Sequence, residues 1–115
     1  MLKIAKEESQ CRVELFQVNR LNTLFSDLVK QQLTELVQEN GASVVFHLEG
    51  IRFIDSSGFD VLLEVGECAR KHGSKFSLCN ISDDVRELLI LMELEGRFEF
   101  LTCENTREKI LVVLD

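Results

Sequence analysis

The residues that could do chemistry are concentrated in one short segment, Asp55-Ser56-Ser57-Gly58, which places two hydroxyl groups directly after a carboxylate. An apolar stretch precedes it and a helical pattern follows, so the segment is predicted to lie where a strand turns into a helix. Ser and Asp are the commonest helix N-cap residues. A helix N-terminus also tolerates negative charge, so a phosphate added there would be accommodated. The segment is therefore either a helix cap alone or a site of modification.

A hydrolytic site would need a base beside one of these serines, and only two histidines are available. His47 falls in an apolar run predicted to be a buried strand, and His72 lies near the predicted end of a helix. The sequence contains no G-x-S-x-G motif, which would place a serine on a nucleophile elbow. We therefore predict that the protein is not an enzyme and has no catalytic residue.

The cysteines suggest neither a metal site nor a disulfide framework. Cys68 and His72 are four residues apart, on one face of a predicted helix, but a structural zinc site needs four ligands with closer pairs. No glycine-rich phosphate-binding loop is present, so no cofactor is expected. The N-terminus mixes Lys and Glu and has no apolar signal region, so the cytoplasm is expected. Four free thiols are expected there: Cys11, Cys68, Cys79 and Cys103.

Length and charge limit the remaining functions. A chain of 115 residues with 45% hydrophobic residues fits one soluble domain, residues 1–115. The net charge of −7 and the lack of a basic stripe argue against nucleic acid and against anionic membranes. No apolar run approaches the ~20 residues that span a bilayer. No heptad pattern is present, so a monomer is expected.

The hydrophobic patterns predict the elements that position this segment. Strands are predicted at residues 2–8, 11–18, 44–48, 75–80 and 98–100. Helices are predicted from 22 to about 40, from 56 to about 71, from 82 onward and from 104 to 114. Asn22 or Thr23 would cap the first helix, and Gly41 would supply its left-handed exit. The order ββαβαβαβα predicts an α/β fold with a layered mixed sheet of about five strands.

Three apolar residues of the third predicted helix, Ile90, Leu91 and Leu94, lie partly off its core stripe. A helix buried over a wide face would explain them. An exposed apolar patch that binds a partner would also explain them.

The segment from Val44 to Phe59, and above all Asp55-Ser56-Ser57-Gly58, resembles the signature of the STAS domain of anti-anti-sigma factors. The resemblance extends over nearly the whole chain, because Gly73, the strand at 75–80, the helix opened by Ser82 and Gly96 follow the family's order. It implies the STAS fold.

The resemblance also implies a function. In this family the unphosphorylated domain binds an anti-sigma factor, usually a serine kinase of the GHKL type, and so releases a sigma factor. The kinase then phosphorylates the serine that corresponds to Ser56, the complex dissociates, and a PP2C-type phosphatase resets the switch. The implied partner-binding residues are Asn19, Leu21, Asn22, Thr23, Asp55, Ser56, Ser57, Gly58 and Phe59.

One position departs from the family pattern. Many relatives have Leu-Asp at the start of the first helix, whereas this chain has Leu21-Asn22, which alters the charge beside Ser56. An alternative function is therefore a STAS scaffold or a subunit of a transport complex that binds partners without being phosphorylated. Ser56 favours the phosphorylated switch, because it matches the modified position.

Overall fold

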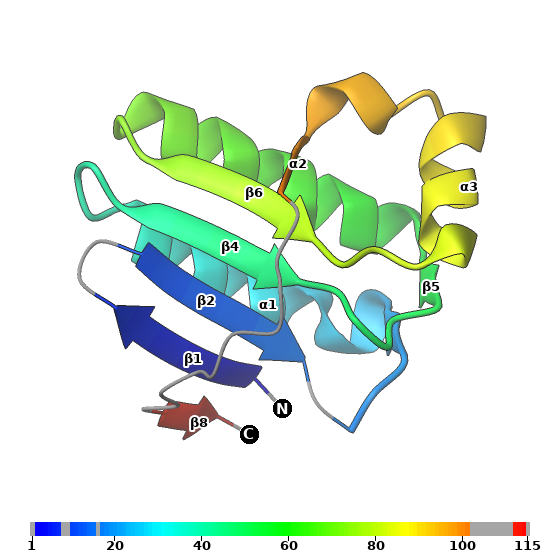
Figure 1. Cartoon of the computed structure of the whole chain (residues 1–115), viewed down its shortest axis with the longest axis horizontal. Helices are drawn as coiled ribbons and strands as arrows, with labels where there is room; N and C mark the ends of the chain where they lie inside the picture. Colours follow the sequence, from blue (N-terminus) through cyan, green and yellow to red (C-terminus); the bar gives the residue numbers. More distant parts are fainter. Residues whose placement is uncertain (1, 8–9, 16, 102–111, 115) are drawn as a thin grey trace.

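The computed structural model describes residues 2–7, 10–15, 17–101 and 112–114. Its main sheet has six strands in the order β7-β6-β4-β2-β1-β8 (Figure 1). Their bounds are Leu2–Glu7 (β1), Gln10–Leu15 (β2), Ser43–His47 (β4), Lys75–Cys79 (β6), Glu99–Leu101 (β7) and Val112–Leu114 (β8). β1 runs antiparallel to both of its neighbours, and the other pairs are parallel. The predicted α/β class with a mixed sheet is confirmed.

In the described residues three α-helices accompany the sheet: α1 (Thr23–Val37), α2 (Ser56–Lys71) and α3 (Asp83–Leu91). α1 and α2 lie side by side across one face of the sheet, and α3 lies at its end (Figure 1). Asn22 caps α1 by accepting the Leu24 N–H at 3.0 Å, and Ser82 caps α3 by accepting the Val85 N–H at 3.2 Å. α1 ends at Val37 and its C-cap, Gln38, is right-handed, so Gly41, with a φ of 76°, is not the exit of the helix as predicted but part of the turn that leads to β4.

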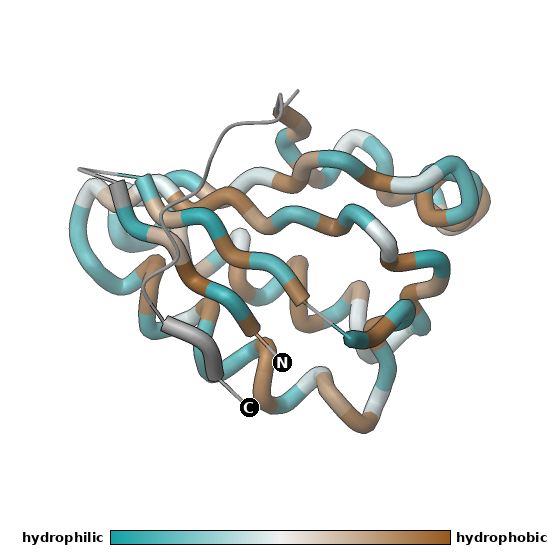
Figure 2. Tube along the Cα trace, turned by 60° about the horizontal axis from the view of Figure 1, so that its bottom comes forward, coloured by the Kyte–Doolittle hydropathy of each residue, from teal (hydrophilic) through white to brown (hydrophobic). Residues whose placement is uncertain are grey.

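The core lies between the sheet and the two long helices. Apolar and polar residues alternate along β2, as the tube in Figure 2 shows, so this strand turns one apolar side toward the helices, whereas β4 is buried on both faces. Val13, Phe46 and Leu78 supply that side from three neighbouring strands. Leu33 of α1 and Leu62 of α2 are fully buried in the same core.

A second, two-stranded sheet was not predicted. It consists of β3 (Arg20–Leu21) and β5 (Phe53–Ile54), which pair in parallel. Each strand runs directly into a helix, β3 into α1 and β5 into α2. The pairing therefore brings the N-termini of the two helices together, although 32 residues separate Thr23 from Asp55.

The predicted helix over residues 104–114 is wrong at its end. Residues 112–114 form strand β8, which pairs with β1 in the register Leu2 to Leu114. The sequence there, Val-Val-Leu, favours an extended chain because valine is β-branched, and β1 offers an unpaired edge. Residues 104–111 lie outside the described part of the chain.

The three apolar residues singled out in the third predicted helix differ in position, because α3 ends at Leu91 and Leu94 lies beyond it. Leu94 is partly buried against the core, whereas the exposed fractions of Ile90 and Leu91 are 53% and 78%. Burial over a wide helix face is therefore wrong for Ile90 and Leu91, and Leu94 packs against the core from the turn that follows the helix. None of the described helices is long and apolar enough to cross a membrane.

Between α3 and β7 the chain makes one short 3₁₀ turn, η1 (Glu95–Arg97).

Candidate functional site

Ser56 is the first residue of α2, and its side chain is exposed. The β3–β5 pairing positions it, because Leu21 and Ile54 are partners in the register and both strands end at the start of a helix. A hydrogen bond from the Arg52 N–H to the Asn19 carbonyl oxygen, at 2.7 Å, joins the residues that directly precede the two strands. The structure therefore brings together the two predicted partner-binding segments, residues 19–23 and 55–59.

Asp55, rather than a serine, caps α2. Its Oδ1 atom accepts the Gly58 N–H at 2.8 Å and the Ser57 hydroxyl at 2.8 Å. Its Oδ2 atom accepts the Thr23 N–H at 3.3 Å and the Thr23 hydroxyl at 3.4 Å. Thr23 is the first residue of α1, so one carboxylate binds the N-termini of both helices.

The ionisation of Asp55 follows from these contacts. Burial acts to raise the pKa of the carboxyl group, but the hydrogen bonds from Gly58, Ser57 and Thr23 together outweigh it. The pKa therefore lies below its ordinary value. The positive ends of two helix dipoles act in the same direction. The group is a carboxylate at neutral pH, and the site already contains one negative charge.

The two serines differ in what they contact. The Ser57 hydroxyl donates to Asp55 and lies 3.2 Å from the Thr23 hydroxyl, so it belongs to the capping network. The Ser56 hydroxyl has no hydrogen-bond partner within the described part of the chain, and the side chain faces solvent. Ser57 is therefore a structural residue, whereas Ser56 is accessible to a second protein.

Three of the predicted partner-binding residues are buried. Leu21 is fully buried, and the exposed fraction of Phe59 is 1%. A Cβ atom on Gly58 would lie 2.8 Å from the Leu21 carbonyl oxygen and 2.8 Å from Cγ2 of Ile54. Glycine is therefore required at residue 58 so that α2 can approach β3 closely. These residues position the site, and their side chains do not form its surface.

Two exposed apolar residues in the segments that lead into or begin the two helices were not predicted as part of the site. Leu24, in the first turn of α1, has an exposed fraction of 83%, and Phe53 of β5 has 44%. Leu24 fits the helical spacing of the core residues, so its exposure is not visible in the pattern. For Phe53 a signal exists in the sequence, because side chains alternate along an extended chain. With Ile54 in the core, the side chain of Phe53 points to the other face.

Neither histidine is bonded to these serines. His47 is buried on β4, where its Nε2 atom accepts hydrogen bonds from Arg12, and its Nδ1 atom lies 3.1 Å from the Cys79 sulfur. His72 ends α2, with Nδ1 2.9 Å from the Cys68 carbonyl oxygen. The described residues contain no group of three or more His, Cys, Asp or Glu side chains that could hold a metal ion. Cys11, Cys68 and Cys79 are not in disulfide bonds, and Cys103 lies outside the described residues.

Comparison with known proteins gives consistent results. The family model for the STAS domain matches residues 7–110. A curated relative, the anti-sigma F factor antagonist of Paenibacillus polymyxa, is 26% identical over 91 residues, which cover 78% of this chain and 75% of the relative.

Solved structures share the fold. An anti-sigma-factor antagonist (STAS) domain protein from Planctomyces limnophilus superposes with a TM-score of 0.76 at 18% identity, covering 90% of this chain and 91% of that one. The unphosphorylated anti-sigma factor antagonist SpoIIAA gives 0.73 at 15% identity, covering 91% and 90%. Phosphorylated SpoIIAA of Bacillus gives 0.68 at 14% identity, covering 91% and 93%. Because the STAS family model matches most of this chain, the chain belongs to the STAS domain family.

Proposed function

We propose that this protein is an anti-sigma factor antagonist: unphosphorylated, it binds an anti-sigma factor through the surface around Ser56, and phosphorylation of Ser56 ends the binding. The names of the Paenibacillus relative and of the SpoIIAA structures support the class of partner. The observation that carries the site assignment is the contrast between the two serines, because Ser57 is hydrogen-bonded within the cap and Ser56 is exposed.

The surface around Ser56 fits a contact with a neutral hydroxyl. Leu24, in the first turn of α1, and Phe53, in the strand that runs into α2, present exposed apolar area, and such area contributes to affinity when a partner covers it. A partner that covers these side chains also removes water from the Ser56 hydroxyl. A phosphate there would carry about −1.5 to −2 charges into the same desolvated contact. The Asp55 carboxylate, ionised because its pKa is lowered, adds repulsion.

The transfer step requires little from this chain. The Ser56 oxygen would form a bond to the γ-phosphorus of ATP while the bond to the ADP oxygen breaks, and the serine proton would pass to a base of the kinase. This chain supplies an exposed hydroxyl at a fixed place. The helix N-terminus then accommodates the product, so the fold is retained after phosphorylation.

The experiment uses the protein with phosphoserine incorporated at residue 56 during translation. The unphosphorylated chain is first used to capture its partner from the cytoplasm of the source cell, and the identified partner is purified for calorimetry. We expect phosphoserine at residue 56 to weaken binding by roughly 100-fold, because an uncompensated charge is buried. The partner, if it is a kinase, should phosphorylate Ser56 but not the Ser56→Ala variant.

Phosphoserine at residue 57 is the matched control, because it carries the same charge one residue away. Since Ser57 is bonded to Asp55, this variant should lose stability as well as affinity. Equal affinity of the unmodified protein and the phosphoserine-56 protein would refute the switch. It would favour a STAS scaffold that binds without phosphorylation.

A further inference from the structure

The C-terminal end of α3 carries exposed apolar side chains. Ile90, Leu91 and Met92 are consecutive, and all three are exposed, Leu91 by 78%. The core side of the same helix is supplied by Val85 and Leu89, which are fully buried. Single exposed apolar residues are ordinary on a protein surface, but three in one place are typical of a surface that another molecule covers.

Acidic groups lie beside these apolar side chains. Glu87 precedes Leu91 by four residues, so the two share one face of the helix. Glu93 follows directly after the C-cap residue Met92. Both carboxylates are exposed, and neither has an ion-pair partner in the described part of the chain.

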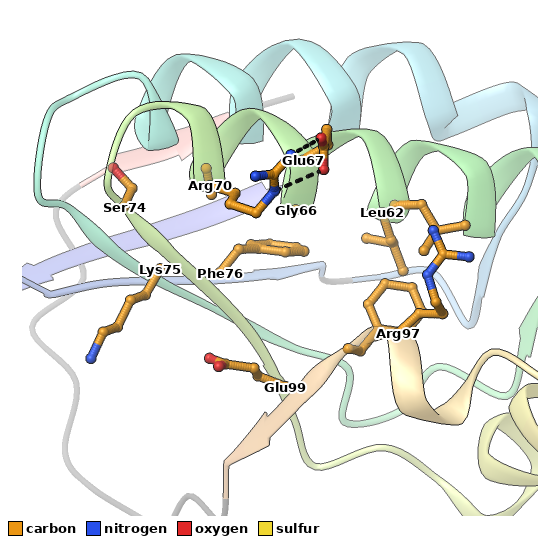
Figure 3. Close-up of a pocket in the computed structure, with 12 residues that line it drawn as sticks. Leu62, Gly66, Glu67, Arg70, Ser74, Lys75, Phe76, Arg97 and Glu99 are labelled. Atoms are coloured by element: carbon orange, nitrogen blue, oxygen red, sulfur yellow. Dashed lines mark hydrogen bonds and ion pairs between the residues drawn. The ribbon is translucent and has the colours of Figure 1, made fainter.

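The basic residues of this region are engaged elsewhere. Arg86, the one basic residue in the sequence of α3, pairs with Glu95 at 3.2 Å, and its guanidinium carbon lies 5.9 Å from the centre of the Phe100 ring. Arg97 is the next basic residue along the chain, and Figure 3 shows its side chain beside Leu62 of α2. The end of α3 is therefore an apolar surface bordered by negative charge.

Glu93 occupies a position that suits glycine better. Its φ is 57°. The Glu93 N–H donates to the Ile90 carbonyl oxygen at 3.0 Å, and the Leu94 N–H donates to the Leu89 carbonyl oxygen at 2.8 Å. α2 ends in the same pair of bonds, but there the left-handed residue is Gly73, with a φ of 68°. Glycine adopts this conformation without strain, whereas a residue with a side chain does so at a cost in stability.

The charge of Glu93 also opposes the helix. Basic residues stabilise the negative end of a helix dipole, and a carboxylate there destabilises it. The last turn of α2 contains Arg70 and Lys71, whereas the last turn of α3 contains no basic residue. Glu93 is thus unfavourable for folding through both its backbone and its charge, which indicates that its carboxylate serves a contact outside the chain.

We propose that the surface formed by Glu87, Ile90, Leu91, Met92 and Glu93 binds a positively charged amphipathic helix of another protein. Apolar side chains of that helix cover Leu91 and its neighbours, and Lys or Arg beside them pair with the two carboxylates.

Charge decides between the possible occupants of this surface. In a symmetric dimer, a second copy of the chain would place Glu87 and Glu93 opposite the same acidic surface. An anionic membrane would repel these carboxylates as well. A basic helix is attracted by them. The surface is small, so the contact is expected to be weak and transient. It includes no residue of the proposed switch at Ser56, and the two proposals are independent.

The probe is a helical peptide of about 18 residues with leucine on one face and lysine on the other, titrated into the full chain labelled with nitrogen-15. We expect saturable chemical-shift changes at the amides of residues 87–93. A peptide with glutamate in place of lysine should bind roughly tenfold more weakly, because the carboxylates repel it. A peptide with serine in place of leucine should also bind roughly tenfold more weakly, because the apolar contact is lost.

Two matched pairs of variants test the apolar and the charged contacts. Leu91→Ser should raise Kd roughly tenfold, whereas Leu24→Ser, at a similarly exposed leucine of α1, should leave it unchanged. Glu87→Gln should raise Kd roughly threefold, because a contact between exposed charges is modest. Glu35→Gln removes the same charge from an exposed position of α1 and should have no effect.

Glu93→Gly separates binding from folding. The variant should raise the melting temperature, because glycine relieves the left-handed strain, and it should raise Kd roughly threefold. A residue that acts in folding alone would leave Kd unchanged.

Three results would overturn the proposal. One is the absence of saturable shift changes at the end of α3, or their appearance at the starts of α1 and α2 instead. Another is an equal effect of Leu91→Ser and Leu24→Ser on Kd. The third is equal affinity for the lysine and the glutamate peptides.

Discussion

The hydroxyl oxygens of Thr23 and Ser57 lie 3.2 Å apart, although 34 residues separate them in the sequence. Both also contact the carboxylate of Asp55, which therefore joins the start of α1 to the start of α2. The proposed switch residue, Ser56, is held in place by this network without taking part in it.

The first prediction concerns the cap itself. Asp55→Ala should reduce the free energy of unfolding at pH 7 by about 1–2 kcal/mol, because the N–H groups of both helix ends lose their acceptor. Asp55→Asn should cost less, because asparagine is a comparable cap. Urea unfolding monitored by circular dichroism measures both. Equal stability of the alanine variant and the wild type would contradict the capping role.

The second prediction concerns pH. The pKa of Asp55 is lowered in the folded protein, so its stabilising effect is present above the unfolded-state pKa of about 3.9 and is lost as the pH falls through the folded-state value. The stability advantage of the wild type over Asp55→Asn should therefore shrink below about pH 4. Urea titrations of both proteins between neutral and acid pH test this. A difference that stays constant over the range would mean that the Asp55 charge does not contribute.

The third prediction compares the same substitution at two glycines of one helix. Gly58→Ala should destabilise the protein by about 1–3 kcal/mol, since its Cβ would meet the Leu21 carbonyl oxygen and Ile54. Gly66→Ala should stabilise it by about 0.5–1 kcal/mol, because alanine favours the helix and meets only an ordinary contact. Thermal unfolding of both variants gives the two signs. If Gly58→Ala also stabilised the protein, the close approach of α2 to β3 would not require glycine at residue 58.

The fourth prediction distinguishes the two serines without any partner. Ser57→Ala should cost about 1 kcal/mol, because it removes a hydrogen bond to the Asp55 carboxylate. Ser56→Ala should change the free energy of unfolding by less than about 0.5 kcal/mol, as is usual for an exposed residue without structural contacts. Chemical denaturation of the two variants is the measurement. A reversed order would assign the structural role to Ser56.

The fifth prediction follows from the proposed function and concerns the apolar residue beside the switch. Leu24→Ala should weaken binding of the anti-sigma partner roughly tenfold, since an exposed leucine in the first turn of α1 would be covered in the complex. Leu91→Ala is the control, because Leu91 is similarly exposed but lies on α3. Neither variant should alter the melting temperature. If Leu91→Ala weakened binding and Leu24→Ala did not, the contact surface would be on α3 instead.

The sequence predicted the parts of the fold that depend on local patterns. α1 and α3 begin after Asn22 and Ser82, because a short polar side chain at that point satisfies free N–H groups. The α2 start was located by the Asp-Ser-Ser-Gly segment. Which of its residues is the cap was not predictable, because Asp and Ser are equally good caps and only the contact with Thr23 separates them.

Pairings between segments that are far apart in the sequence could not be predicted from local residue patterns. Strands of two residues, such as β3 and β5, have no periodicity, so the small sheet that unites the two halves of the site was missed. The strand at Val112–Leu114 is explained by its pairing with β1, at the other end of the sequence.

The exposed, unbonded position of Ser56 has a consequence for how such proteins can diverge. Thr23, Asp55 and Ser57 form one cooperative unit, so changes among them are expected to occur together in descendants. Ser56 makes no contact that the fold needs, and a single substitution there can remove the proposed phosphate acceptor at almost no thermodynamic cost. If the proposed switch operates, a copy that binds its partner permanently can therefore arise after gene duplication in one step from a copy that is switched.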